Sequence, residues 1–255
     1  MKQVFYFCLL LFTFCFSSFA FWSCSKSTND TYSDFRTLDY FPLKIGASAI
    51  YTLDTIQFDP GTGVVKIDTF RWFAQEIIRD TFTDSQKNVN YLVDRYEHSR
   101  NANDTVWVYR RTYVVTVTNQ NIQKVEGTFR YIKLPNNFVL NQQWDGNAYL
   151  DTYATIQVAN NTVLPFIQTW KSTITSVNST ETISNKTFSD VTTVEAKSDP
   201  NILTERRYQL EKYAKGIGLI SRQLEILDTQ ILDPTKTWEK KAQKGFIIKQ
   251  VISDK

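Results

Sequence analysis

Histidine and cysteine are the scarcest reactive residues in this chain of 255 residues. The single histidine is His98, and the three cysteines, Cys8, Cys15 and Cys24, all lie within the first 24 positions. A disulfide within the rest of the chain is therefore excluded. Transition-metal sites draw on several His and Cys ligands, so we expect no metal site and no cofactor.

Motifs for catalysis are missing as well. A Ser or Cys nucleophile needs a nearby base, and His98 lies at the end of an expected strand, where adjacent side chains point to opposite faces. Gly216-Ile217-Gly218 lacks the strand and helix that flank a dinucleotide-binding loop, so we interpret it as a turn. We assign no catalytic residue and expect a protein that is not an enzyme.

The chain also lacks an excess of charge of either sign. It has 29 Lys and Arg residues against 26 Asp and Glu residues, which gives a formal net charge of +3. Basic pairs such as Arg110-Arg111 are diluted by nearby acidic residues. Nucleic-acid binding requires a concentrated basic surface, so a nucleic-acid partner is not expected.

Apolar residues are concentrated at the N-terminus. After Lys2, residues 4–22 carry no charge and are rich in Phe and Leu, and the small residues Ser17, Ser18 and Ala20 lie near the end of this run. This pattern is typical of a secretory signal peptide. A permanent transmembrane anchor is the alternative, because about 20 apolar residues also span a bilayer.

The sequence Phe21-Trp22-Ser23-Cys24 resembles the lipobox of bacterial lipoproteins, in which the cysteine is acylated and becomes the first mature residue. We therefore predict lipidation at Cys24 and attachment to a membrane through that lipid. Residues 1–23 would be the signal peptide, 24–36 the lipidated cysteine with a flexible polar tether, and 37–255 a single β-rich domain. Cleavage after Ala20 would instead release a soluble product.

Period-two patterns of β-branched and aromatic residues dominate the predicted domain, and long helical stripes are scarce. We expect a mainly β fold with antiparallel hairpins. The expected strands cover residues 50–58, 64–73, 76–81, 89–96, 105–118, 122–134, 150–158, 166–177, 203–214, 219–227 and 246–251. In the first of them the apolar residues change from odd to even positions between Leu53 and Ile56, which predicts a β-bulge near Asp54.

The clearest alternation lies in residues 105–118. One face of this strand would carry five apolar residues in the core: Trp107, Tyr109, Tyr113, Val115 and Val117. The other face, with Thr112 and Thr116, would meet solvent.

Two short motifs, Tyr40-Phe41-Pro42-Leu43-Lys44-Ile45-Gly46 and Tyr213-Ala214-Lys215-Gly216-Ile217-Gly218-Leu219-Ile220, carry a resemblance. Together they resemble a group of Bacteroidota outer-membrane lipoproteins of uncharacterised function. The resemblance implies a single antiparallel curved sheet, a half-barrel or open barrel, on a lipid tether at the outer membrane of the cell envelope. It carries over no catalytic residue.

Two tripeptides, Asp54-Thr55-Ile56 and Asp104-Thr105-Val106, are similar to the sites at which Bacteroidota glycosylate exported proteins. They make Thr55 and Thr105 candidates for O-glycosylation. Asp-Thr pairs also commonly begin turns, which is the alternative reading.

Three functional hypotheses follow. The first is a non-enzymatic binding or scaffold module of the envelope, with an exposed aromatic patch that meets a glycan, lipid or protein. The second is a carrier of an apolar ligand or lipid, which needs an apolar cavity of at least about 300 Å³. The third is a carbohydrate-active enzyme with two carboxylates about 5 to 9.5 Å apart. The available carboxylates include Glu76, Glu126, Asp145, Glu181 and Glu195.

Overall fold

A computed structural model describes residues 36–61, 63–100, 106–151, 153–159, 161–163, 171–199 and 202–253. By its contacts, the chain from residue 34 to residue 255 is one compact unit, the second of two, and every described residue belongs to it. The predicted signal peptide, Cys24 and Thr105 lie outside the described residues.

The second unit is built almost entirely of strands. It begins with the 3₁₀ turn η1 (Thr37–Tyr40). The strands that follow are β1 (Ser48–Asp59), β2 (Lys66–Thr83), β3 (Val89–Ser99), β4 (Val108–Val117), β5 (Asn121–Glu126), β6 (Phe129–Pro135), β7 (Gln143–Trp144), β8 (Ile156–Val158), β9 (Asn161–Val163), β10 (Lys171–Ile183), β11 (Lys186–Lys197), β12 (Glu205–Ala214) and β13 (Gly218–Asp228). The fold ends with the helical turn α2 (Trp238–Lys241) and the strand β14 (Lys244–Ser253).

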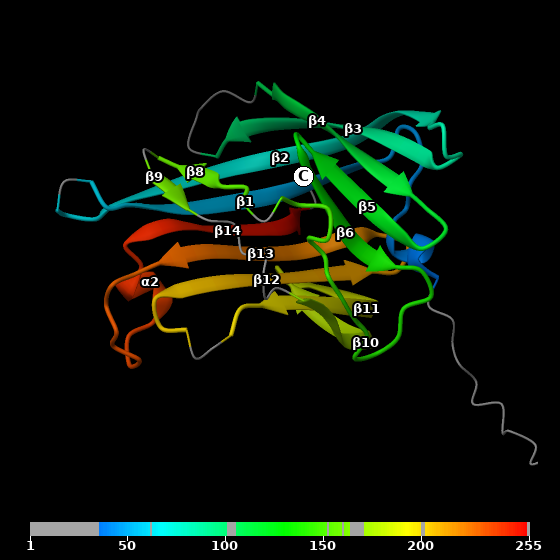
Figure 1. The fold of residues 1–255 in the computed structure, drawn as a ribbon. Helices are drawn as coiled ribbons and strands as arrows, with labels where there is room; N and C mark the ends of the chain where they lie inside the picture. The colour runs from blue at the N-terminus through cyan, green and yellow to red at the C-terminus, as the bar shows by residue number, and fades with distance from the viewer. Residues whose placement is uncertain are drawn as a thin grey trace, which may run out of the picture. The chain divides into compact units, whose positions relative to one another are not determined.

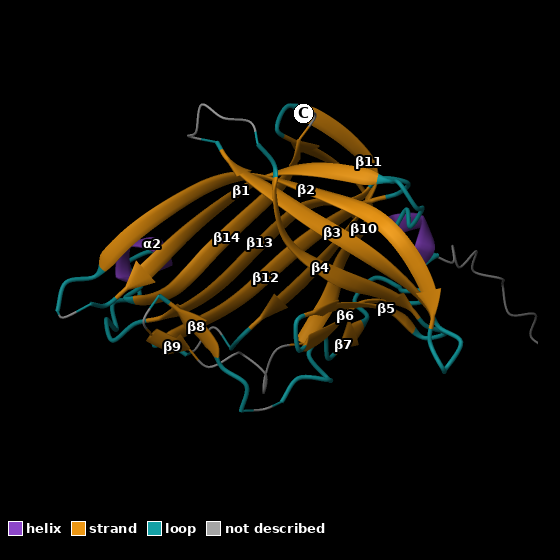
Figure 2. Ribbon diagram, turned by 90° about the horizontal axis from the view of Figure 1, so that it is seen from above, coloured by secondary structure: helices purple, strands orange, loops and turns teal. Residues whose placement is uncertain are grey.

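Twelve of these strands form one antiparallel sheet in the order β6-β5-β4-β3-β2-β1-β14-β13-β12-β11-β10-β7. Strands β1 and β14 pair along nine residues and so join the N-terminal half of the sheet to the C-terminal half. The sheet curves strongly on itself, as Figures 1 and 2 show. The predicted mainly β fold, with a single antiparallel curved sheet in the form of an open barrel, is confirmed.

The two edges of the sheet meet at β6 and β7. The backbone N–H of Ile132 donates to the carbonyl of Gly146 at 2.9 Å, and the Trp144 indole donates to the carbonyl of Ile132 at 3.1 Å. A Cβ at Gly146 would lie 2.8 Å from the Ser172 hydroxyl, so the two edges approach closely at this glycine. The barrel is therefore nearly closed, with a short seam in place of a full strand pairing.

Residues 36–47 pack across one end of the barrel. The Thr37 hydroxyl donates to the Pro135 carbonyl at 2.6 Å, and the Tyr40 ring, 1% exposed, contacts Phe138 edge-on at 5.4 Å. Further along, Leu43 packs against the core residues of β2 to β5. This segment therefore contacts walls that are distant from each other in the sheet.

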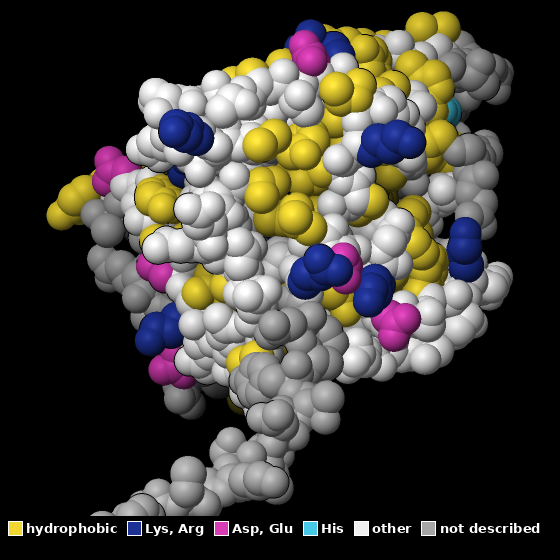
Figure 3. Space-filling view, turned by 90° about the vertical axis from the view of Figure 1, so that its right-hand side faces the viewer, with side chains coloured by type: hydrophobic (Ala, Val, Ile, Leu, Met, Phe, Trp, Pro, Cys, Tyr) yellow, Lys and Arg dark blue, Asp and Glu magenta, His cyan; other side chains and the backbone are white. Residues whose placement is uncertain are grey.

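The two motifs that carry the resemblance are in contact at this end. The Phe41 and Tyr213 rings lie 5.1 Å apart, and the N–H of Gly216 donates to the Asp39 carbonyl at 2.7 Å. Gly218 has φ +97° and lies so close to Pro42 that an added Cβ would be 3.2 Å from the proline ring. Figure 3 shows this end, where apolar side chains lie exposed among Lys and Arg.

The predicted bulge near Asp54 is wrong, because β1 pairs with β2 and β14 without a break in register. The change of the apolar residues from odd to even positions along β1 has another cause. Tyr51 lines the interior of the barrel, whereas Phe58 lies on the opposite face under α2 and packs with Leu227 and Ile247. The two ends of β1 are thus buried on opposite faces.

Several strand boundaries also need correction. Residues 64–73 and 76–81 belong to one long strand, β2, and the expected strand 122–134 is a hairpin of β5 and β6 that turns at Gly127, which has φ +61°. Strand 150–158 is limited to β8, and strand 166–177 becomes β10 from Lys171 onward, with residues 164–170 outside the description. The sequence patterns missed β11, β7 and β9.

The face assigned to residues 105–118 is correct only in its second half. Tyr113 and Val115 are buried, but Tyr109 is exposed and Trp107 precedes the strand. A register shift in the pairing with β3, between Arg95 and Tyr96, places Tyr109 on the outer face. On the face expected to meet solvent, Thr116 is buried and donates to Asn90 at 2.6 Å.

Candidate functional site

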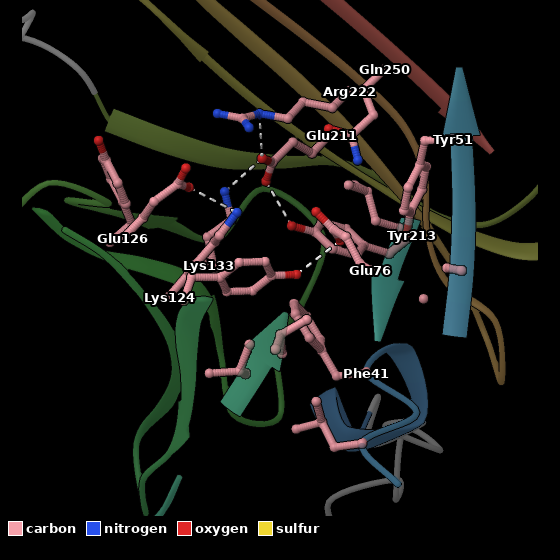
Figure 4. A pocket seen from close by; sticks show the side chains of 18 of the residues that line it. Phe41, Tyr51, Glu76, Lys124, Glu126, Lys133, Glu211, Tyr213, Arg222 and Gln250 are labelled. Atoms are coloured by element: carbon pink, nitrogen blue, oxygen red, sulfur yellow. Dashed lines mark hydrogen bonds and ion pairs between the residues drawn. The ribbon is translucent and has the colours of Figure 1, made fainter. Parts of the chain in front are cut away.

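A cavity of about 200 Å³ lies inside the barrel, against the segment that packs across its end. Its wall is formed by inward-facing residues of strands from both halves of the sheet, together with Phe41, Pro42 and Leu43. Figure 4 shows that charged and tyrosine side chains from these strands converge on it. The cavity is the candidate site because it brings together ionisable groups that are far apart in sequence.

Glu211 on β12 is the most enclosed carboxylate of this wall. Lys133 Nζ lies 2.6 Å from its Oε1, Arg222 Nε lies 3.4 Å from the same oxygen, and the Tyr213 hydroxyl donates to Oε2 at 2.7 Å. Burial acts to raise the pKa of Glu211, but the charges of Lys133 and Arg222 outweigh it and lower that pKa below its usual value. Glu211 is therefore ionised at neutral pH.

For Lys133 on β6, the effect of burial on the pKa outweighs the effect of its carboxylate partner. Burial lowers its pKa to about 8, and the nearby cations Arg222 and Lys124 lower it too, while Glu211 opposes the change. Because Lys133 and Glu211 come from β6 and β12, their contact joins an edge strand to the far wall of the barrel.

Glu126 on β5 is also held by two cations. Arg111 lies 2.6 Å from Oε1 and Lys124 lies 3.0 Å from Oε2. Lys124, followed by Arg111, lowers the pKa of Glu126 to about 2 against the effect of burial. The Lys124 ammonium also lies 3.9 Å from the centre of the Tyr113 ring, a cation–π contact.

A third group surrounds Glu76 on β2. Arg95 contacts Glu76 at 3.0 Å and Glu97 at 2.8 Å, and the Tyr113 hydroxyl donates to Glu76 at 2.8 Å. Arg110 contacts the second oxygen of Glu97 at 3.5 Å. Tyr113 therefore links this group to Lys124.

We call these residues together the charged cluster. Its members are Lys124, Lys133, Arg95, Arg110, Arg111, Arg222, Glu76, Glu97, Glu126 and Glu211. With all ten ionised, the six cations exceed the four carboxylates by two charges. Arg110 and Arg111 have exposed side chains, so the enclosed members of the cluster, four cations and four carboxylates, are balanced in charge.

Of the five carboxylates expected from the sequence, Glu76 and Glu126 line the cavity. Asp145 accepts the N–H of Asn147 at 2.9 Å in a turn beside the packed Trp144. Glu181 contacts Lys212 and Glu195 contacts Lys197, both away from the cavity lining.

Sequence reasoning missed Glu211, Lys133 and Arg222. On β12 the inward face carries Gln209, Glu211 and Tyr213. A polar face with one tyrosine gives little indication of burial, since polar strand faces usually meet solvent. The inward face becomes identifiable only when the opposite wall is known.

An aromatic patch lies on the outer face of β2, β3 and the start of β4. The His98 ring lies 5.0 Å from Phe73 and 4.5 Å from Trp107, and Tyr96 meets Tyr109 at 5.7 Å. His98 Nδ1 is also 3.1 Å from its neighbour's carbonyl. Through these contacts His98 packs among aromatic side chains.

The candidate O-glycosylation site Thr55 lies in the middle of β1, paired on both sides, so Asp54-Thr55 does not begin a turn. Among the described residues, no three His, Cys, Asp or Glu side chains are grouped so as to hold a metal ion. No helix in the described part of the chain has the length and hydropathy to cross a bilayer.

No family model and no curated protein matches the chain. Among solved structures, a candidate lipoprotein from Parabacteroides distasonis is 13% identical over 84% of this chain and 98% of its own, with a TM-score of 0.38. A candidate exported protein with a YmcC-like fold from Bacteroides fragilis is 7% identical over 83% of this chain and 99% of its own, with a TM-score of 0.30. Neither likeness is close enough to establish a shared function.

Proposed function

We propose that the chain is an exported lipoprotein, anchored through Cys24 in the outer membrane of the cell envelope, that acts as a non-enzymatic binding module. The observation that carries the binding role is the cavity inside the barrel, where charged groups from both halves of the sheet converge. The anchor rests on the lipobox-like sequence before Cys24.

The ionisation of the cavity carboxylates supports a non-enzymatic role. A glycoside hydrolase needs one carboxylic acid with a raised pKa to protonate the leaving group. Glu126 and Glu211 have lowered pKa values because each is held by two cations. They are therefore poor general acids at neutral pH.

The cavity also disfavours the apolar carrier. Its volume of about 200 Å³ is below the roughly 300 Å³ at which ligand pockets begin. Its wall contains six charged side chains, Lys124, Lys133, Arg222, Glu76, Glu126 and Glu211, and an uncharged lipid would bury them without offering them hydrogen bonds. A small polar ligand suits this wall better.

The anchor is tested by replacing Cys24 with Ser in the full chain and separating membrane and soluble fractions. We expect the variant to fold but to leave the membrane fraction, whereas Cys15→Ser, a matched change within the leader, stays with the membrane. A Cys24→Ser protein that resisted a carbonate wash would show an uncleaved transmembrane anchor instead.

The binding role is tested by analysing the small molecules that protein purified from native membranes releases on denaturation. We expect the wild type to release a compound in near-stoichiometric amount and Lys133→Met to release much less. Identical release from both proteins would rule out the cavity as the binding site.

A further inference from the structure

We propose that the cavity binds a small organic carboxylate with an apolar portion, whose anionic group is received between Lys133, Arg222 and Lys124. This inference rests on the proposed binding function and names the class of its ligand. Three features of the cavity carry it: a local excess of cations, unused hydrogen-bond donors and an apolar wall.

The first feature is a local excess of cations where the anion would lie: Lys124, Lys133 and Arg222 line the cavity there against two carboxylates, Glu126 and Glu211. Glu211 and Glu126 are each shared by two cations, so these three cations lack carboxylates for one-to-one pairing. Like charges enclosed together repel more strongly than they would in water, because the interior screens them less. An incoming anion relieves that repulsion, whereas a cation increases it.

The second feature is the supply of free donors at the cavity. Arg222 Nε is buried and has no hydrogen bond, since its contact with Glu211 at 3.4 Å is an ion pair only. Figure 4 shows Lys124, Lys133 and Arg222 directed toward one region of the cavity. A guanidinium beside two ammonium groups matches the two oxygens of a carboxylate.

The third feature is the rest of the wall, which limits the ligand. Apolar side chains line much of it, among them Phe41, Leu43, Ile78, Leu219 and Leu224. A volume of about 200 Å³ corresponds to roughly seven water molecules at about 30 Å³ each. An aromatic or short aliphatic acid fits this space, and a phospholipid does not.

The test is calorimetric titration of the purified mature protein with benzoate and hexanoate, and with the uncharged benzamide and hexanamide. We expect the acids to bind at least tenfold more tightly than the amides. Lys133→Met and Arg222→Met should each weaken acid binding by at least tenfold. The matched control Lys197→Met, on the exposed Lys197 of β11, should bind the acids like the wild type.

Circular dichroism establishes that each variant is folded, and Arg222→Lys, which keeps the charge, provides a second readout. We expect Arg222→Lys to bind the acids more tightly than Arg222→Met. The proposal is overturned if acids and amides bind equally, if neither acid binds, or if both Met variants keep wild-type affinity. A neutral compound released from native protein would then preserve the binding function and reject the anionic class.

Discussion

Two regions of the barrel's interior are filled in opposite ways. Beside the β8–β9 hairpin lies an apolar cluster of Val158, Val163, Ala196, Leu224 and Ile226, in which Ile226 is fully buried. Elsewhere on the inner side of the same sheet lies the charged cluster, in which Glu211 is almost as completely buried. One sheet therefore supports both a hydrophobic core and an enclosed group of charges.

The contrast separates stability from function. Burial of an apolar side chain stabilises the fold by roughly 1.5–3 kcal/mol, whereas a buried ion pair must first overcome the loss of its hydration. Apolar residues in place of the charged cluster would serve the fold equally well or better. We infer that the charges at the cavity serve the binding of a ligand.

Removal of one member of the charged cluster should have the largest effect on stability. Glu211→Leu leaves Lys133 and Arg222 without their carboxylate, which should lower the free energy of unfolding by about 3–5 kcal/mol. Urea denaturation measures this change. Glu195→Leu is the matched control, because its partner Lys197 is exposed and such pairs contribute about 1 kcal/mol or less. Equal effects of the two changes would show that Glu211 is not electrostatically enclosed.

A cavity in the apolar cluster should lower the free energy of unfolding slightly less than Glu211→Leu does. Ile226→Ala removes a fully buried side chain, and we expect a loss of about 3 kcal/mol in the free energy of unfolding. Ile217→Ala, at a 42% exposed position, should change it by less than about 0.5 kcal/mol. A small effect at Ile226 would mean that the β8–β9 hairpin does not pack against the sheet as described.

Low pH should reduce the contribution of the charged cluster to the free energy of unfolding and leave that of the apolar cluster unchanged. The folded-state pKa values of Glu126, about 2, and of Glu211 are lowered. Their contribution is fully present above the unfolded-state pKa near 4.5 and is lost as pH falls toward 2. We expect Glu126 to account for about 2 kcal/mol of this loss, measured as the difference between wild type and Glu126→Gln. Parallel pH profiles of the two proteins would contradict the assigned contacts.

The class of fold was predictable because period-two alternation of apolar and polar residues, clearest in residues 105–118 that include β4, is typical of a two-sided sheet. Sequence patterns predicted strand geometry poorly where both faces of a strand are buried. In β1, Tyr51 and Phe58 are buried on opposite faces, and this imitates a bulge. The hairpin of β10 and β11 was missed because Ser184 and Asn185, both with positive φ, form a tight turn without glycine.

The candidate site was less predictable than the fold. Glu76 and Glu126 were identified as available carboxylates, but the contact of Lys133 on β6 with Glu211 on β12, two strands far apart in the sheet order, was not. Pairing between distant strands is set by the closure of the barrel. Local patterns carry no information about which side chains then face each other across the interior.

The most direct test of the account is the triple variant Lys133→Met, Glu211→Leu, Arg222→Met, with its stability and benzoate affinity measured together. If the charged cluster serves binding, the variant should be at least as stable as the wild type, because well-packed apolar residues often replace a buried ion group at no cost. It should also bind benzoate at least tenfold more weakly. A variant as unstable as Glu211→Leu that still binds benzoate with wild-type affinity would show that these charges hold the fold together and do not bind the ligand.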